Sequence, residues 1–444
     1  MLALLPLAVA RPFVGVLLWS WISFMNPHQL LWGTASGLPW AALVFGATVF
    51  GCVVAGEPKR LAVNAVTMLL LVLMACFTLT SVAALAPAAG VWAKWELTMK
   101  VLLVLLLTAS LLTDRWRVHA LVWIMVLSIG YYGVRGGVFT LINGGNFRVW
   151  GPPNTMIADN NHLAAALLVA LPLMNYLRMH SRHAAVRWAL AGAAVLTLLA
   201  ALGSQSRGAL LGLGAATVVM WLRSRHKMLS GVVLAVCMTG AVSFMPDSWT
   251  QRMNTIQTYE ADASATDRLV LWGISLKLAL DRPLVGSGFT GPYNRAVVDR
   301  VEPSGPARAV HSIWFELLGE QGFPTFLAWF GLTLAGFWYA WRLVRLTRDR
   351  PDLAWACDLG RMAQVSIIAY LVSGSFLSLS YWDFYWTLLV VVGATHALAI
   401  EALRQDSKAG MGAGWRPSPA VEGAPAQKAR PWRPAFAGRG AAQQ

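Results

Sequence analysis

The sequence contains little charge and few cysteines for its length. Only 12% of its 444 residues are charged, whereas 57% are hydrophobic. A soluble chain would carry about twice this share of charge, so a set of soluble domains is excluded. The four cysteines are Cys52, Cys76, Cys237 and Cys357, and they lack the spacing of a metal site or a disulfide framework. No HExxH or CxxC motif occurs. We therefore expect neither a metal nor a cofactor.

Long apolar runs dominate what is present. Many exceed about 18 residues, the length that spans a hydrocarbon core of about 30 Å. They predict an all-α polytopic membrane protein with about 12 transmembrane helices. The first run leads directly into further spans, so we expect no cleavable signal peptide. The expected spans are 2–24, 38–55, 61–81, 97–113, 118–137, 161–177, 187–203, 208–222, 228–245, 323–344, 361–379 and 383–400.

The net charge of +15 comes largely from Lys and Arg in short loops between these runs. One set of alternating loops holds fifteen of these cations. The other set holds four, namely Lys94, Arg135, Arg148 and Arg207. By the positive-inside rule the richer set is cytoplasmic, and an even number of spans then places both termini there. The positive-inside rule therefore explains the excess of Lys and Arg, and we expect no nucleic-acid partner.

One long loop and one tail stand apart from the apolar runs. Residues 246–322 form the long loop, which the predicted topology places on the outer, periplasmic side. Within it, residues 268–280 have helical periodicity, and a loop of this length with its own helices is usually functional. From residue 405 the chain is rich in Gly, Pro and Ala with scattered cations. We expect a membrane domain over 1–404 and a disordered basic cytoplasmic tail over 405–444.

Three arginines on the outer side are not needed for topology. Arg207 lies in GSQSRGALLG, between two spans joined by almost no loop. A cation at that depth costs a few kcal/mol unless it is paired or faces a wet cavity. Arg268 opens the amphipathic segment, and Arg148 lies between glycines and a Pro-Pro pair. They are candidates for binding phosphate. Alternatively, each reaches lipid phosphate or pairs with a carboxylate such as Asp159, Asp267 or Glu316.

His311 closes the long loop in AVHSIWFELLGEQGFP, where the chain re-enters the membrane. A neutral imidazole is a natural general base near neutral pH, although a lone histidine is often simply buried. The same stretch contains Glu316, which we count among the residues that could contact an acceptor or support the site.

Three further polar residues are candidates with an ordinary structural alternative. Asp159 and Asn161 precede an expected span in WGPPNTMIADNNH, where they would either cap the helix or contact a sugar. Lys100 follows Glu96 by one helical turn. The two should form a structural ion pair, or Lys100 leans into the same cavity as the arginines.

Cations and a base at the outer membrane surface suggest a chemistry. Guanidinium groups bind phosphate oxygens with two parallel hydrogen bonds, and a lipid pyrophosphate would place its charge at that depth. The arginines could stabilise a departing pyrophosphate while His311 takes a proton from an incoming sugar hydroxyl. A lipid-linked glycan flippase is the alternative from another class. It would want polar residues through the mid-membrane, where the spans hold few.

Three segments resemble the O-antigen ligase and polymerase superfamily over roughly residues 160–390. They are SQSRGALLG, DRLVLWGISLKLALDRPLVGSGFTG and HSIWFELLGEQGFP. The resemblance implies a GT-C-like membrane fold. It also implies inverting, metal-independent transfer of a glycan from undecaprenyl pyrophosphate to the lipid A-core oligosaccharide, at the periplasmic face of the bacterial inner membrane. Arg207, Arg268 and His311 match the arginines and histidine of its ligases.

The N-terminal part resembles a narrower group. The segments RPFVGVLLWSWISFMNPH and GGNFRVWGPPNTMIADNNH are similar to O-glycosylation ligases associated with exosortase systems. The acceptor is therefore open between lipid A-core, a protein and another glycan. A polymerase that joins lipid-linked repeats remains an alternative.

Overall fold

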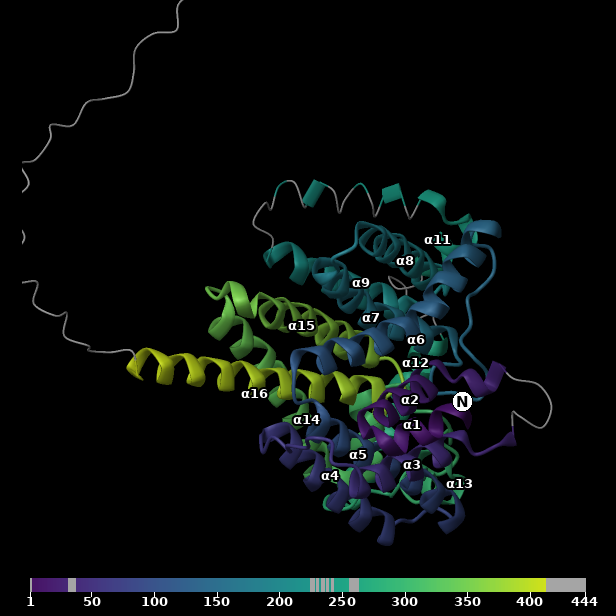
Figure 1. The fold of residues 1–444 in the computed structure, drawn as a ribbon. Coiled ribbons are helices and arrows are strands. Elements are labelled where there is room, and N and C mark those ends of the chain that lie inside the picture. Colours follow the sequence, from purple (N-terminus) through teal and green to yellow (C-terminus); the bar gives the residue numbers. More distant parts are fainter. Residues whose placement is uncertain are drawn as a thin grey trace, which may run out of the picture. The chain divides into compact units, whose positions relative to one another are not determined.

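A computed structural model of the chain describes residues 2–30, 37–223, 228, 231–232, 236, 239–240, 243–254 and 263–412. Within these residues all regular secondary structure is helical, which confirms the expected all-α class (Figure 1). The α-helices are α1 (Leu5–Ala10), α2 (Pro12–Met25), α3 (Trp40–Val54), α4 (Ala65–Val82), α5 (Ala88–Leu111), α6 (Arg115–Ile142), α7 (Asn160–His180), α8 (Ala184–Gly203), α9 (Arg207–Arg223), α11 (Asp247–Asn254), α12 (Ala263–Asp281), α13 (Arg295–Val298), α14 (Ile313–Thr347), α15 (Ala354–Gly374) and α16 (Asp383–Gly412). Short 3-10 helices are η1 (Leu2–Leu4), η2 (Pro27–Leu30), η5 (Gly291–Tyr293) and η6 (Pro351–Leu353).

Five described helices are long and apolar enough to cross a membrane. They are α4, α6, α7, α8 and the part of α16 from Asp383 to Asp406. Shorter apolar helices cover Pro12–Met25, Trp40–Val54 and Arg207–Leu222. The membrane character is thus confirmed, while the number of about 12 spans stays a prediction. Half of the expected span 228–245 lies outside the described residues.

The first expected span, 2–24, is divided in two. Helix α1 ends before Arg11, whose backbone leaves the helical region with φ −135° and ψ 88°, and α2 begins at Pro12. The proline ring disfavours helical geometry in the residue before it, which explains the break. At the other end of the chain, α16 continues to Gly412, so the first residues of the predicted tail are helical. Residues 413–444 lie outside the described residues.

The chain divides into two compact units, Met1–Glu401 and Ala402–Gln444, and the first contains the bundle. In it, α6 and α8 approach closely because glycines face the partner helix. A Cβ added to Gly137 would lie 2.2 Å from the Leu196 carbonyl oxygen, and one added to Gly133 would lie 2.2 Å from Thr197 Oγ1. Small residues permit such close backbone contact between membrane helices.

The long helix α14 contains a sharp break at Gly322, which has φ 73° and ψ 178°. A side chain there would meet the Pro283 carbonyl oxygen at 2.8 Å, so glycine is required. The preceding segment, 313–321, belongs to the loop predicted over 246–322, and the remainder contains the predicted span 323–344. The amides of Ser287 and Gly288 donate to the carbonyls of Gly319 (3.0 Å) and Glu320 (2.7 Å). These bonds satisfy carbonyls that the break leaves without helical partners.

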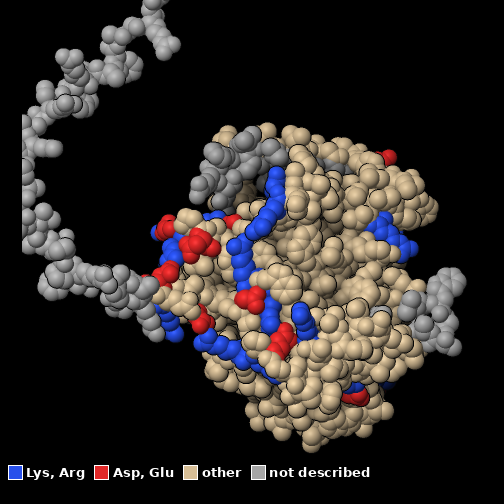
Figure 2. Space-filling model, in the orientation of Figure 1, with Lys and Arg blue, Asp and Glu red and all other residues tan. Residues whose placement is uncertain are grey.

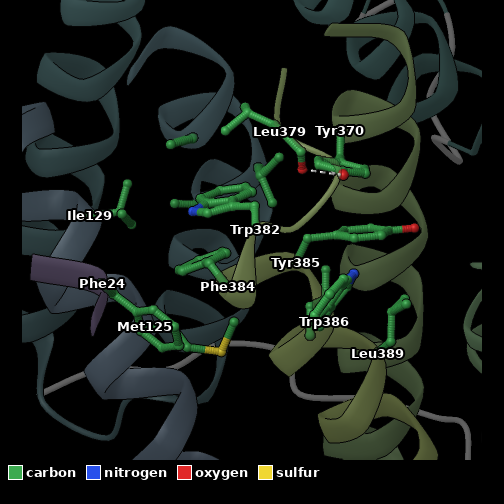
Figure 3. Packing of buried hydrophobic residues seen from close by; sticks show 14 of the residues in the cluster. Phe24, Met125, Ile129, Tyr370, Leu379, Trp382, Phe384, Tyr385, Trp386 and Leu389 are labelled. Carbon is green, nitrogen blue, oxygen red and sulfur yellow. Dashed lines mark hydrogen bonds between the residues drawn. The ribbon is translucent and has the colours of Figure 1, made fainter. Parts of the chain in front are cut away.

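The turn at residues 375–382, between α15 and α16, rests on a buried aromatic cluster (Figure 3). The rings of Tyr370 and Tyr385 stack with centroids 3.7 Å apart, and Trp382 stacks on Phe384 at 4.9 Å. The Tyr370 hydroxyl donates to the Leu379 carbonyl at 2.8 Å. All four rings are buried, so their packing fixes the conformation of the turn.

Several helix junctions meet at one end of the bundle, which we call the site face. It contains the junctions 83–87, 143–159, 204–206, 282–312 and 375–382. They are linked, for example, by the amides of Leu85 and Val149, which donate to the carbonyls of Ser287 (2.9 Å) and Gly203 (3.2 Å). In the view of Figure 2, Lys and Arg form a band that runs down the middle of the molecule beside acidic residues, and most of the rest of this face is uncharged.

Candidate active site

Arg207 opens helix α9 at the site face, directly after a tightly fixed junction. Ser206 caps the helix, since its hydroxyl accepts a bond from the Ala209 amide at 3.2 Å. Asn160, at the start of α7, donates from Nδ2 to the Ser204 carbonyl at 2.7 Å. Unsatisfied amides and the helix dipole make such an N-terminus favourable for an anion, and Arg207 adds a full positive charge.

Arg148 lies beside the same junction. Its Nε donates to Gln205 Oε1 at 3.4 Å, and Gln205 Nε2 donates in turn to the Gly145 carbonyl at 3.2 Å. Gln205 has a left-handed backbone with φ 56°, which turns the chain from α8 into α9. The structure therefore brings Arg148 close to the start of α9.

His311 lies where the loop enters α14. Its backbone amide donates to Ser378 Oγ at 3.0 Å, and its backbone is left-handed with φ 55°. The 375–382 turn thus holds His311 in a conformation that most residues avoid.

Helix α12 joins Arg268 to this arrangement. Trp272, one turn after Arg268, donates from Nε1 to the Val310 carbonyl at 3.1 Å. The Trp272 ring lies 6.3 Å from that of Phe376. A Cβ added to Gly208, beside Arg207, would contact Phe376 at 3.4 Å. Phe376 therefore lies between the start of α9 and α12.

The electrostatic neighbours of His311 include several of the predicted residues. Burial lowers the pKa of His311, and the charges of Arg268 and His162 lower it further, whereas Asp159 and Glu316 oppose the shift. Its imidazole is therefore neutral near pH 7 and able to accept a proton.

Asp159 caps α7, as its structural alternative predicted. Its Oδ1 accepts bonds from the Asn161 amide at 2.8 Å, from Asn161 Nδ2 at 2.9 Å and from His162 Nδ1 at 3.2 Å. Burial alone would raise the pKa of Asp159, but the hydrogen bonds from His162 and Asn161 outweigh it and hold that pKa well below its usual range. Asp159 is thus a fixed anion near His311. Asn161 donates to Asp159, and among the described residues it makes no hydrogen bond with His311.

Glu316 supports the turn that holds His311. Its Oε2 accepts bonds from the Ser380 hydroxyl at 2.6 Å and the Ser380 amide at 3.3 Å. Its Oε1 accepts one from the Tyr293 hydroxyl at 3.2 Å. Because Ser380 and Ser378 lie on the same short turn, buried Glu316 fixes the partner of His311.

The sequence does not predict an ion pair that includes a fully buried carboxylate. Lys94 on α5 lies 3.2 and 3.3 Å from the two carboxylate oxygens of Glu320, whose side chain has no exposed surface. Glu320 also accepts bonds from the Tyr381 hydroxyl at 2.6 Å and the Thr290 amide at 3.0 Å. Lys100, the lysine that the sequence singled out, instead forms the expected ion pair with Glu96.

A cavity of about 440 Å³ adjoins this ion pair. We call it the N-terminal cavity, because most of its lining residues precede residue 158, in α2, η2, α3, α5 and residues 154–157, and residues 381–383 complete it. Within the part of the chain that the structure describes, no group of three or more His, Cys, Asp or Glu side chains is placed to hold a metal ion. Cys52, Cys76 and Cys357 are free thiols, and Cys237 lies outside the described residues.

Comparison with known proteins divides the chain. Residues 1–182 match a family of unknown function (DUF5935), and residues 192–330 match the O-Antigen ligase family. No curated protein matches the chain. The second match contains Arg207, Arg268, His311, Glu316 and Glu320. The match over residues 192–330 supports an assignment of this segment to the O-antigen ligase and polymerase superfamily.

Proposed function

We propose that this protein is a glycan ligase. It would transfer a glycan from undecaprenyl pyrophosphate to the lipid A-core oligosaccharide at the periplasmic face of the bacterial inner membrane. The match of residues 192–330 to the O-antigen ligase family supports a glycosyl-transfer enzyme that acts on lipid-linked glycans. One observation carries the finer proposal. Within the O-antigen ligase segment, Arg207, Arg268 and His311 lie on elements that meet around the 375–382 turn.

The proposed reaction uses these residues in separate roles. The acceptor hydroxyl attacks the anomeric carbon of the donor sugar, and the bond from that carbon to the diphosphate oxygen breaks. The hydroxyl proton passes to His311, and the electron pair leaves with undecaprenyl pyrophosphate. Arg207, Arg268 and Arg148 stabilise the charge that develops on this leaving group. Attack opposite the leaving group inverts the configuration, and no divalent ion takes part.

We call Arg207 and Arg268 the clamp arginines, because they are proposed to hold the diphosphate of the donor. Loss of either should lower the catalytic efficiency with the donor. A charge-assisted hydrogen bond contributes about 1.5–3 kcal/mol, so Arg207→Ala and Arg268→Ala should each lower kcat/KM for the donor by about 10–100-fold. Initial rates at varied donor concentration measure this. Arg308→Ala is the matched control, because Arg308 is half-exposed and paired with Asp267 at 2.6 Å. Unchanged kinetics in both clamp variants would contradict the phosphate role.

The pH profile should report His311. Because burial and neighbouring cations lower its pKa, the acid limb of kcat/KM should lie below the ordinary histidine value of about 6.5. Transfer is then lost only as pH falls through that depressed pKa. Arg268→Ala removes a repelling charge, so the remaining activity should show an acid limb at higher pH. If the acid limb does not move in the Arg268 variant, the charge of Arg268 does not affect the pKa of His311, and this prediction is wrong.

Reconstitution decides between the ligase and its alternatives. Purified protein in liposomes receives a defined undecaprenyl-pyrophosphate glycan and, separately, lipid A-core, a candidate acceptor protein or a second lipid-linked repeat. A ligase gives product with lipid A-core, a protein O-glycosylation ligase with the protein, and a polymerase with the second repeat. A flippase gives no new glycosidic bond in any arm. Each arm is repeated in excess chelator, where we expect full activity.

A further inference from the structure

The reaction described above assigns no role to the N-terminal cavity, although the walls of this cavity continue to the candidate site. Its walls come from α2, η2, α3 and α5, from residues 154–157 and from residues 381–383. Two of these walls continue directly to the candidate site. Residues 154–157 precede Asp159, and residues 381–383 include the end of the turn that carries Ser378 and Ser380. A ligand in the cavity would therefore lie next to the elements that hold His311.

The polar groups of the cavity are both donors and acceptors. Asp383 accepts a bond from the Ser23 hydroxyl, and Asn26 Nδ2 donates to the Ser23 carbonyl at 2.8 Å. The Asn26 side-chain oxygen and the Asp383 carboxylate retain accepting capacity. His28 Nδ1 is buried, and no partner for it occurs among the described residues.

The charge of the cavity argues against a diphosphate. Lys94 is the one cation among the described lining residues, and Glu320 neutralises it through two contacts at 3.2 and 3.3 Å. Asp383 adds a carboxylate. The arginines that suit phosphate oxygens belong to the start of α9, α12 and the 143–159 junction. The two halves of a transfer reaction thus have separate environments, one cationic and one without excess positive charge.

Most of the remaining walls are apolar, with Trp19, Phe24, Leu97 and Trp382 among them, and Thr98, Asn154 and Thr155 add polar side chains. Apolar walls with a few convergent polar groups are typical of small-ligand sites, and about 440 Å³ falls within their usual range. A neutral sugar ring presents apolar C–H faces and a rim of hydroxyls that both donate and accept. Its chemistry matches both the walls and the polar groups.

We propose that the N-terminal cavity binds neutral sugar residues of the acceptor and presents the acceptor hydroxyl to His311. This inference rests on the proposed glycan-transfer function and assigns a task to the region of unknown family, residues 1–182. The cavity would hold the ring next to the one that reacts, with the diphosphate of the donor on the arginine side.

Filling the cavity tests this proposal. Ala41 on α3 lines it, whereas the neighbouring Ala42 is exposed and does not. Ala41→Phe should raise the KM for the acceptor by at least about tenfold, the effect of losing about 1.4 kcal/mol of binding. The donor KM and the kcat at saturating acceptor should stay within about twofold of wild type. Ala42→Phe, with the same substitution one residue later, should behave like wild type.

A binding measurement separates this proposal from the proposed function. The probe is a lipid-free oligosaccharide that contains only the neutral sugars of the core, titrated by calorimetry into wild type and both variants in detergent, without donor. Binding that Ala41→Phe weakens and Ala42→Phe does not would support the cavity even if no transfer product forms. No binding to wild type, equal binding to all three proteins, or an effect of Ala41→Phe on the donor KM alone would overturn it.

Discussion

Replacement of His311 by alanine should lower kcat for glycan transfer by about 10²–10⁴-fold, the usual contribution of a general base. Without the imidazole, the proton of the attacking hydroxyl has no acceptor at the start of α14. Donor binding should persist, since it depends on the arginines of α9, α12 and the 143–159 junction. Transfer rates in proteoliposomes and retention of labelled donor measure the two effects separately.

The backbone of His311 supplies a control for folding. Because His311 has φ 55°, a substitution can disturb the 375–382 turn for conformational reasons alone. Asparagine tolerates the left-handed region better than most residues, so His311→Asn should preserve the turn and still be inactive. Full transfer activity in either variant would remove the general-base role. Loss of donor retention in both would point to a structural role instead.

Replacement of Lys94 by methionine should destabilise the protein by about 3–5 kcal/mol, the usual result of removing one partner of a buried ion pair. The substitution leaves the Glu320 carboxylate without its cation in a place where its side chain has no exposed surface. Its remaining donors, the Tyr381 hydroxyl and the Thr290 amide, do not balance the charge. Unfolding in mixed detergent micelles with increasing denaturing detergent measures the loss.

Two variants isolate the origin of that effect. Lys100→Met lies on the same helix and removes a partly exposed ion pair with Glu96, so it should cost less than about 1 kcal/mol. In the double variant Lys94→Met with Glu320→Gln, the uncompensated charge is gone and most of the lost stability should return. A Lys94 variant as stable as the Lys100 variant would show that the pair contributes nothing.

The sequence predicted much of the fold because membrane helices carry strong local signals. Apolar runs located helices such as α4, α7 and α8, and the periodicity of residues 268–280 located α12. Pro12 divides the first span at Arg11. In the sequence this division appears only as polar and proline residues that interrupt the apolar run. The break at Gly322 was not predicted, since a lone glycine gives no indication that the Pro283 carbonyl packs against it.

The candidate site residues were chosen for a similar reason, and their roles stay predictions. Cations that topology does not require pointed to Arg148, Arg207 and Arg268, and local pattern singled out His311. The pairing of Lys94 with Glu320 spans 226 residues of sequence, and no local signal connects them. Both lysines lie on α5, and only tertiary packing decides that Lys94 reaches Glu320 while Lys100 pairs with Glu96.

The capping of the α14 break by Ser287 and Gly288 makes the break a rigid elbow. Opening it would strip two carbonyls of their donors in a setting with little water, at a cost of about 1–3 kcal/mol for each. The amide protons of Ser287 and Gly288 should therefore exchange with solvent as slowly as those in the middle of α14. If the outer surface rearranges when substrate arrives, the pivot has to be found in another segment of the chain.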